Sequence, residues 1–323
     1  YTGSELSSVT STNTADGGID DINLGNGSKT VIAGVGADTV DTGTSGIHRV
    51  IGDNGTITYN AGALRSMTSD AHADGGEDTI ALSGDVNQVI GGSAADGITV
   101  STASSTDHVL GDNGTMTYTG VKGSEQLTNM QSDLGETGGD DTVTLGSGDK
   151  IVIAGKGKDT VKTTLNSAGS RIVLGDEGEI AYDASLNLET VKSTSTEGDS
   201  DTLTLGGTNS DTNFVIGGVG SDDIDTGDST DIVLGDNGQI SWNNTILTSV
   251  TSTDTANGAA DDIDLGDGEK TVIAGIGADF VDAAAGNHKV IGDNGELTYT
   301  AGKLDKVTST AAALGGDQGG IDT

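Results

Sequence analysis

The chain has 323 residues, of which 54 are glycine, and it contains neither proline nor cysteine. Its net charge of −36 at pH 7 disfavours binding to nucleic acid and to anionic membrane surfaces. No run of apolar residues is long enough to cross a membrane, so we expect no membrane insertion.

The chain repeats itself at an interval of about sixty residues. We predict one continuous array over residues 1–323, and we expect it to be a segment of a longer chain, because both ends fall inside a repeat. The repeats cover approximately residues 1–59, 60–118, 119–182, 183–242 and 243–299, with a partial repeat at 300–323. The sequence Gly-Asp-Asn-Gly, or once Gly-Asp-Glu-Gly, marks each full repeat and begins at Gly52, Gly111, Gly175, Gly235 and Gly292.

Each repeat divides into three pairs of short strands, because sixty residues is too long for one supersecondary unit. The two central apolar residues of a pair are 13, 9 and 7 residues apart in turn, and this pattern holds in fourteen of fifteen turns. The connections that lead to the next pair vary from 9 to 14 residues. In the first repeat the central residues of the pairs are Val9 and Ile22, Val31 and Val40, and Val50 and Ile57.

Turns of constant length that alternate with connections of variable length are typical of a chain wound into a stack. We predict an all-β protein, a right-handed parallel β-solenoid or β-roll of two sheets with three rungs per repeat. The turns of constant length form one edge, called the strict edge here. The variable connections form the opposite edge, the loose edge, where insertions cost little free energy.

The strict edge carries one aspartate per turn. In the 13- and 9-residue steps it stands two places before the second apolar residue, and in the 7-residue step it stands two places earlier still. Carboxylates stacked about 5 Å apart repel by roughly 3 kcal/mol per pair, so we expect cations between them. The alternative, that aspartate only favours turns, does not account for the constant spacing. The fifteen candidate metal ligands are Asp20, Asp38, Asp53, Asp78, Asp96, Asp112, Asp141, Asp159, Asp176, Asp201, Asp222, Asp236, Asp261, Asp279 and Asp293.

The types of ligand favour Ca²⁺. Carboxylates and glycine carbonyls are hard oxygen ligands, and in a flexible loop they suit Ca²⁺ better than Mg²⁺. The chain has no cysteine and its four histidines do not pair, so zinc and copper lack ligands. We interpret His48, His108 and His288, which recur just before the valine of a rung, as solvated surface groups. We expect about two or three Ca²⁺ ions per repeat and no other cofactor.

The nine-residue turns resemble the calcium-binding nonapeptide of the repeats-in-toxin (RTX) family of secreted bacterial proteins. They carry Gly-x-Gly-x-Asp followed two places later by an apolar residue, and only the turn before Asp96 lacks the inner glycine. The resemblance implies a parallel β-roll like those of giant repetitive RTX-type surface proteins and adhesins. It also implies that Asp38, Asp159, Asp222 and Asp279 bind Ca²⁺, although the nonapeptide covers only one turn in three. The matching turns are Ala33–Val40, Ala154–Val161, Gly217–Ile224 and Ala274–Val281.

In two rungs of three, a second large apolar residue follows the valine. Neighbouring residues of a strand face opposite ways, so this apolar stripe faces outward if the valines face the core. A local bulge that turns both inward is the alternative. An outward stripe predicts side-by-side packing with copies of the chain or with another part of the same long chain. The stripe consists of Ile32, Ile51, Ile90, Leu110, Ile153, Leu174, Ile216, Leu234, Ile273 and Ile291.

These features predict a structural, calcium-stiffened extracellular rod, part of a bacterial surface fibre, an adhesin stalk or a matrix protein. A module that binds carbohydrates or cell surfaces is the alternative, because Thr56, Thr58 and their equivalents would form a row of hydroxyls. That row is interrupted at Glu179. A β-helix polysaccharide lyase or epimerase is disfavoured, since the three arginines do not converge in sequence, and we predict no catalytic residue.

Overall fold

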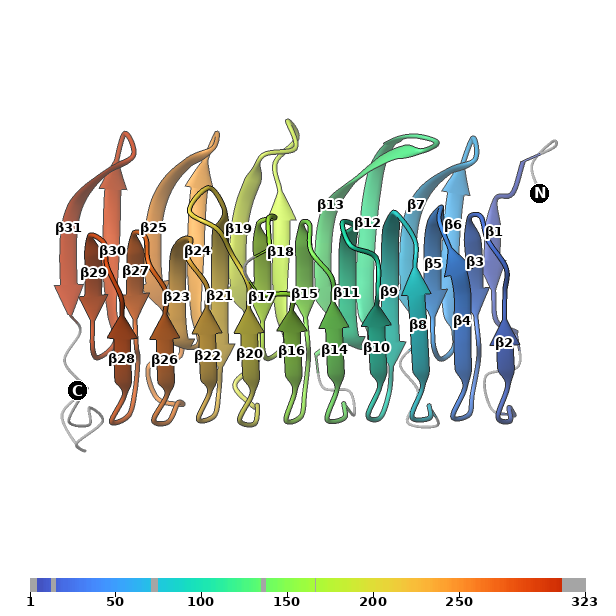
Figure 1. Ribbon diagram of the computed structural model, residues 1–323, viewed down its shortest axis with the longest axis horizontal. Coiled ribbons are helices and arrows are strands. Elements are labelled where there is room, and N and C mark those ends of the chain that lie inside the picture. Colours follow the sequence, from blue (N-terminus) through green and yellow to red (C-terminus); the bar gives the residue numbers. More distant parts are fainter. Residues whose placement is uncertain (1–4, 13–15, 71–74, 135–137, 166, 310–323) are drawn as a thin grey trace.

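The computed structural model describes residues 5–12, 16–70, 75–134, 138–165 and 167–309. Within them the chain is all β, and its strands stack side by side into three long sheets (Figure 1). The predicted all-β parallel solenoid is confirmed. None of the described segments is a helix long and apolar enough to cross a membrane. Residues 310–323 of the predicted partial repeat lie outside the described residues.

Two of the sheets are parallel, and together they form the roll. The strands of the outer roll sheet are, in spatial order, β2 (Asp21–Asn23), β4 (Thr39–Thr44), β8 (Thr79–Ser83), β10 (Gly97–Val100), β14 (Thr142–Leu145), β16 (Thr160–Thr163), β20 (Thr202–Leu205), β22 (Asp223–Thr226), β26 (Asp262–Leu265) and β28 (Phe280–Ala283). Those of the inner roll sheet are β3 (Lys29–Ile32), β5 (Ile47–Ile51), β9 (Val86–Gly92), β11 (Thr106–Asp112), β15 (Lys150–Ile153), β17 (Arg171–Leu174), β21 (Thr212–Gly218), β23 (Thr230–Asp236), β27 (Lys270–Ile273) and β29 (His288–Ile291).

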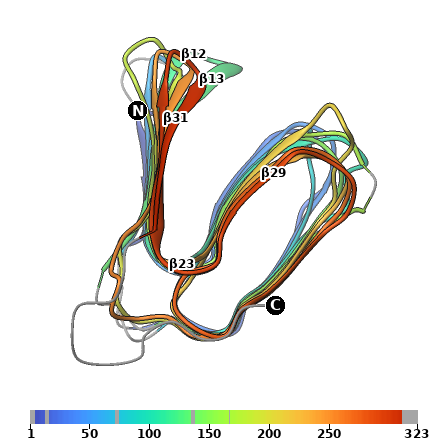
Figure 2. The same cartoon turned by 90° about the vertical axis from the view of Figure 1, so that its left-hand side faces the viewer.

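The third sheet, the hairpin sheet, is antiparallel and forms a separate layer beside the closed roll (Figure 2). Apart from β1, it is built of two-stranded hairpins that alternate with the rungs of the roll along the chain. Its strands are, in spatial order, β1 (Ser8–Thr10), β6 (Gly55–Asn60), β7 (Ala63–Ser69), β12 (Gly114–Val121), β13 (Ser124–Ser132), β18 (Gly178–Tyr182), β19 (Leu188–Ser193), β24 (Gly238–Asn243), β25 (Ile246–Ser252), β30 (Gly295–Thr300) and β31 (Lys303–Ser309).

The hairpins correct the prediction of three rungs per repeat. Each repeat contributes two rungs to the roll and one hairpin to the third sheet. The 7-residue step leads into the hairpin, where Ile57 pairs with Met67 on the antiparallel return strand. The loop of this hairpin is Ala61-Gly62, with φ of 51° and 71°. Two residues with positive φ are the geometry of a type I′ turn, which reverses the chain where a further rung was expected.

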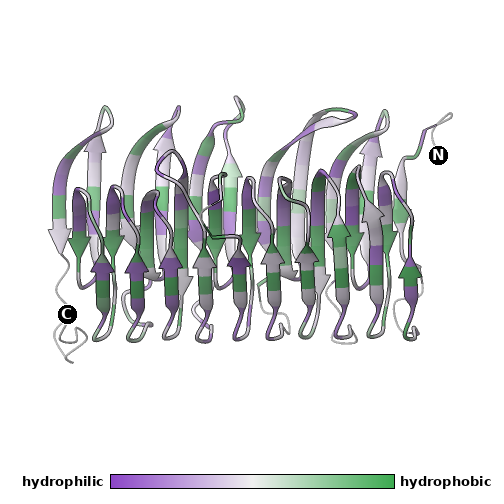
Figure 3. Cartoon of the chain, viewed as in Figure 1, coloured by the Kyte–Doolittle hydropathy of each residue, from purple (hydrophilic) through white to green (hydrophobic). Residues whose placement is uncertain are grey.

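The protein has two apolar layers, one inside the roll and one between the roll and the hairpin sheet. Two of every three members of the predicted valine and second-strand columns meet between the two roll sheets, where Val50, Val89 and Ile80 are fully buried. The remaining members, such as Ile57 and Met67, are buried against the hairpin sheet instead. Hydrophobic residues form bands across the strands (Figure 3), as expected when alternate residues of every strand face a core. The second apolar layer lies between the inner roll sheet and the hairpin sheet.

The apolar stripe belongs to this second layer. Ile51, Ile90 and Leu110 point out of the roll, as their parity predicts, and hairpin residues such as Met116 cover them. Their exposed fractions are 1% or less. The hairpin sheet of the same segment therefore accounts for the stripe without a neighbouring rod. Side-by-side packing of rods stays a prediction.

Candidate functional site

Ten of the fifteen predicted aspartates form one continuous row at the strict edge, called the aspartate ladder here. The backbone N–H of each aspartate donates to Oδ1 of the next, with N···O distances of 2.7–3.0 Å in all nine steps. The 13- and 9-residue steps both lead into the outer roll sheet, so their aspartates fall in one column. The ladder consists of Asp20, Asp38, Asp78, Asp96, Asp141, Asp159, Asp201, Asp222, Asp261 and Asp279.

The second carboxyl oxygen of the ladder residues, Oδ2, is turned into the protein. In six of them it lies against a glycine at the end of a facing strand. A Cβ atom on Gly111 would lie 2.2 Å from Oδ2 of Asp141, and one on Gly235 would lie 2.2 Å from Oδ2 of Asp261. Glycine is required at these positions because no side chain fits there. Within the described part of the chain, a buried Oδ2 that accepts no hydrogen bond occurs in Asp38, Asp78, Asp96, Asp141, Asp159, Asp201, Asp222 and Asp261.

Burial makes the charged form of these carboxyls unfavourable. It raises the pKa of Asp78 and Asp159 to about 8, that of Asp96 to about 9, and those of Asp201 and Asp261 to about 10. Repulsion from neighbouring ladder aspartates adds to the effect, while the N–H bonds to Oδ1 oppose it. The ladder is therefore a row of carboxyls that needs a neutralising partner, either a proton or a cation.

The aspartates of the Gly-Asp-Asn-Gly and Gly-Asp-Glu-Gly turns form a different arrangement. Their turn leads into the hairpin sheet, so the structure places them outside the ladder. Asp112 accepts the N–H of Gly139 on Oδ1 at 3.2 Å and that of Lys156 on Oδ2 at 2.6 Å, and Asp53 makes the equivalent pair of bonds. Burial raises the pKa of Asp112 to about 7. These carboxyls tie neighbouring loops together, and the five positions are Asp53, Asp112, Asp176, Asp236 and Asp293.

The ladder fits a hard cation in charge and in ligand type. Carboxylate oxygens are among the hard ligands that Ca²⁺ binds, and those of the ladder include buried oxygens that accept no hydrogen bond. Eight residues of the ladder supply one such oxygen each. In the described ranges, no group of three or more acidic or histidine side chains that could hold a metal ion is assembled at one point. Calcium bound at this edge would therefore depend on carbonyl oxygens as well as on the ladder.

The inner roll sheet carries a second row of polar residues, which the sequence analysis missed. It stands two places before each rung valine, so it faces the inside of the roll, close to the loose edge. Strand pairing brings its members into register, as for Asp107 beside Lys150. This polar column consists of Lys29, His48, Asn87, Asp107, Lys150, Arg171, Asn213, Asp231, Lys270 and His288.

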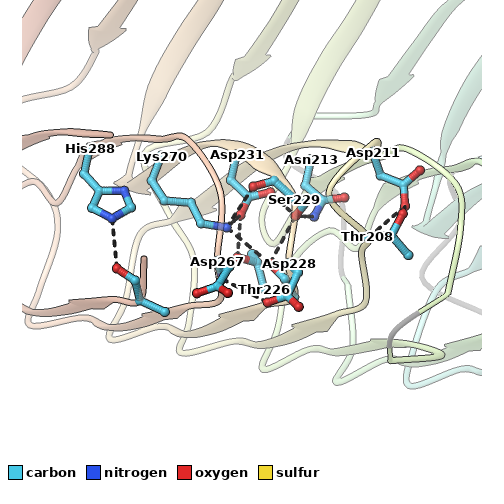
Figure 4. A network of polar contacts seen from close by, with 12 residues as sticks. Thr208, Asp211, Asn213, Thr226, Asp228, Ser229, Asp231, Asp267, Lys270 and His288 are labelled. Atoms are coloured by element: carbon cyan, nitrogen blue, oxygen red, sulfur yellow. Dashed lines mark hydrogen bonds and ion pairs between the residues drawn. The ribbon is translucent and has the colours of Figure 1, made fainter. Parts of the chain in front are cut away.

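Opposite charges in the polar column pair inside the roll (Figure 4). Lys270 Nζ lies 2.6 Å from Asp231 Oδ2, and Lys150 Nζ lies 2.7 Å from Asp107 Oδ2. All four side chains are fully buried. Lys270 also donates to the carbonyl oxygen of Ser229 at 3.0 Å. The two buried lysines are therefore neutralised within the protein, as a buried charge requires. The buried guanidinium of Arg171 donates instead to the carbonyl oxygen of Ser167, at 2.9 Å.

The polar column has a period of two repeats. Odd repeats carry Lys followed by His or Arg, and even repeats carry Asn followed by Asp. The equivalent lysines Lys150 and Lys270 are 120 residues apart (270 − 150 = 120). The turn sequences alternate in the same way, with Ile-Ala-Gly at Ile32, Ile153 and Ile273, and Ile-Gly-Gly in the even repeats. The chain is thus built from two-repeat units. The residues two places before the rung valines show this period in the sequence.

The interpretation of the histidines as solvated groups is wrong for two of them. His48 is buried in the polar column, with Nδ1 2.7 Å from Thr42 Oγ1. His108 faces the hairpin sheet, and its Nδ1 lies 3.0 Å from the hydroxyl of Tyr118. Burial lowers the pKa of both, that of His108 to about 4, so His108 is neutral at pH 7.

Comparison of the chain with known protein families, with curated proteins and with solved structures gave no match. We therefore infer function from the geometry of the two edges and of the sheets between them.

Proposed function

We propose that the chain is a structural rod, a calcium-stiffened segment of an extracellular bacterial surface fibre, adhesin stalk or matrix protein. The observation that carries this proposal is the continuity of the three sheets. Hydrogen-bonded strands run without a break from β1 to β31, and each two-repeat unit places the same kinds of side chain in the same places. An architecture of stacked repeats that contact only their neighbours sets length and stiffness.

Calcium enters the proposal through the aspartate ladder. Eight of its carboxyls bury an oxygen without a hydrogen-bond donor, and the net charge of −36 adds repulsion along the whole rod. Bound Ca²⁺ would supply positive charge and oxygen coordination, and the ladder aspartates are the residues that would hold it. Likeness of the nine-residue turns to the RTX nonapeptide supports both the metal and the extracellular setting.

The modular rod can be tested by removing one two-repeat unit, residues 119–242. Tyr118 and Trp242 occupy equivalent places in their hairpins, so the new junction preserves the path of the chain. Asp107 would then pair with Lys270 as it now pairs with Lys150. The deletion removes four strands from each of the three sheets.

Small-angle scattering of this deletion in Ca²⁺ should show a rod about 19 Å shorter with an unchanged cross-section. A changed cross-section, or loss of the strand signal in circular dichroism, would contradict the proposal of a rod assembled from interchangeable units.

A further inference from the structure

The inner roll sheet and the hairpin sheet diverge from a common line near the strict edge (Figure 2). Two cavities of about 230 and 210 Å³ lie between these sheets, at the margin of the second apolar layer. Along this margin Tyr182, Phe214, Trp242 and Tyr299 are only partly buried, and the line that they form with the two cavities is called the groove here. The first lies between β11, β15 and the hairpins β12–β13 and β18–β19. The second lies between β23, β27 and the hairpins β24–β25 and β30–β31.

The two cavities are equivalent, one per two-repeat unit. Strands β11 and β23 are four places apart in the inner roll sheet, so the cavities lie about 19 Å apart along the groove. Each has a half-buried tyrosine on one wall and an exposed threonine at the mouth. The matching residues of the first and second cavity are Thr106 and Thr230, Leu127 and Leu247, and Tyr182 and Tyr299.

The cavity walls combine aromatic and hydrogen-bonding groups. Beside Tyr182 the exposed amide of Gln126 and the hydroxyl of Thr106 reach the first cavity, and beside Tyr299 the exposed carboxylate of Glu269 reaches the second. An apolar wall with a few polar groups around it is the general design of a small-molecule site. An aromatic face with hydrogen-bonding groups at its rim suits a sugar ring, which has C–H groups on its faces and hydroxyls on its edges.

Between the cavities the groove stays aromatic. Phe214 packs edge to face on Trp242, with ring centroids 4.9 Å apart, in the place where a cavity would otherwise recur. A ligand that uses both cavities must therefore be long, straight and repetitive. The net charge of −36 disfavours a polyanion.

We propose that this groove binds an extended, neutral, β-linked polysaccharide, with one sugar ring packed against Tyr182 and another against Tyr299. Such a glycan is straight and repeats its faces at a constant interval, which matches a groove with equivalent cavities at a constant interval. This function goes beyond that of the rod and does not depend on calcium in the aspartate ladder.

Trp242 is the only tryptophan of the chain and lies in register with Leu247, which lines the second cavity. Its fluorescence can therefore report binding. Titration of the intact segment with cellohexaose should give a saturable change in emission, and cellobiose should bind at least about tenfold more weakly because it reaches one cavity only. Maltohexaose, whose α-linked chain curves, and heparin, a polyanion, should give no saturable response.

The variant that tests the site fills the cavities instead of removing packing. Thr106→Phe with Thr230→Phe should weaken cellohexaose binding at least about tenfold and leave circular dichroism unchanged. The matched control, Thr79→Phe with Thr144→Phe, places the same rings on the exposed face of the outer roll sheet and should leave binding unchanged. Tyr182→Phe with Tyr299→Phe keeps both rings and should bind within about twofold of the parent.

Three results would overturn the proposal. They are no response to cellohexaose, an equal response to maltohexaose or heparin, and binding that survives the double cavity-filling variant.

Discussion

The two edges of the roll bury polar side chains in opposite ways. At the strict edge one residue type repeats on every rung, so the geometry is constant, but buried oxygens of like charge accumulate without partners. At the loose edge the polar column alternates basic, amide and acidic residues, and its buried lysines pair with aspartates within the protein. Uniform rungs thus need a neutralising partner from outside, whereas alternating rungs need the right order of repeats.

The largest expected effect concerns pH at the strict edge, in the presence of a chelator. Burial raises the pKa of the ladder carboxyls, to about 7 for Asp222 and about 10 for Asp201 and Asp261, from about 3.9 in an unfolded chain. The folded chain then binds more protons than the unfolded chain. Their contribution to stability is fully present below about pH 4 and is lost as the pH rises through the folded-state values.

The free energy of unfolding in chelator should therefore fall from about pH 5 to about pH 9, by about 1.4 kcal/mol per pH unit for each carboxyl that keeps its proton. Several such carboxyls match the whole stability of a typical domain, about 5–15 kcal/mol. Urea denaturation followed by circular dichroism measures this. Because the pKa of His108 is about 4, that buried histidine does not titrate in this range, whereas the hairpin-turn aspartates, such as Asp112 with a pKa of about 7, add to the fall in the same direction. A stability that is constant or rises with pH would show that the ladder does not carry the effect.

The loose edge can be broken by removing a single repeat, residues 183–242, instead of the two-repeat unit. The aspartate ladder stays continuous, but Arg171 and Lys270 become neighbours and Asp231 is lost. A buried lysine without its carboxylate should cost about 3–5 kcal/mol relative to the two-repeat deletion. Denaturant midpoints of the two deletions give the comparison. Equal stabilities would mean that the order of the polar column is unimportant.

A single substitution sharpens the account of the strict edge. Asp159→Asn keeps the Oδ1 acceptor for the N–H of Asp141 and removes a carboxyl that must bind a proton or a cation when it is buried. In chelator at neutral pH it should stabilise the chain by about 1–3 kcal/mol, and in Ca²⁺ the gain should disappear or reverse. Asp262→Asn, on the exposed face of the outer roll sheet, is the control and should change stability by no more than about 0.5 kcal/mol. A loss of stability for Asp159→Asn in chelator would argue against an unneutralised ladder.

The smallest expected effect lies outside both edges. Lys192 Nζ is 2.8 Å from Glu179 Oε2 on the hairpin sheet, and both side chains are partly exposed, at 35% and 26%. Lys192→Ala should cost at most about 1 kcal/mol, because water screens the pair. Thermal denaturation of Lys192→Ala beside Lys270→Met compares an exposed pair with a buried one. Similar losses of stability in the two variants would mean that the buried ion pair of the loose edge contributes no more than the exposed pair.

Much of the roll follows from the sequence, because the valine spacing is set by strand length and by the turns of the strict edge. The hairpins do not follow from it. Ile57 and Met67 alternate with polar neighbours as a rung would, and only the Ala61-Gly62 turn marks the reversal. Apolar periodicity defines which face of a strand is buried, but it does not define which sheet the strand joins.

The candidate site, like the fold, could be predicted from the sequence only in part. The fifteen aspartates lie in turns or, for Asp112 and Asp236, in the last residue of a strand. Their division into ten ladder and five hairpin-turn residues depends on which sheet each step enters. The polar column could have been predicted from the alternation of side chains along a strand, because a residue two places before an inward-facing valine must also face inward. Attention to the repeated residues alone hides this column, because its members, such as Lys150 and Asp231, change from repeat to repeat.

The central claim is that the strict edge needs a cation that the loose edge does not. The most direct test is thermal unfolding at pH 7 and low ionic strength after metal removal, with Ca²⁺ then added back, with Mg²⁺ as the control and with bound metal counted. We expect a large rise in melting temperature that saturates with Ca²⁺, a much smaller rise with Mg²⁺, and about two or three bound ions per sixty-residue repeat. An unchanged melting temperature and no bound calcium would contradict it.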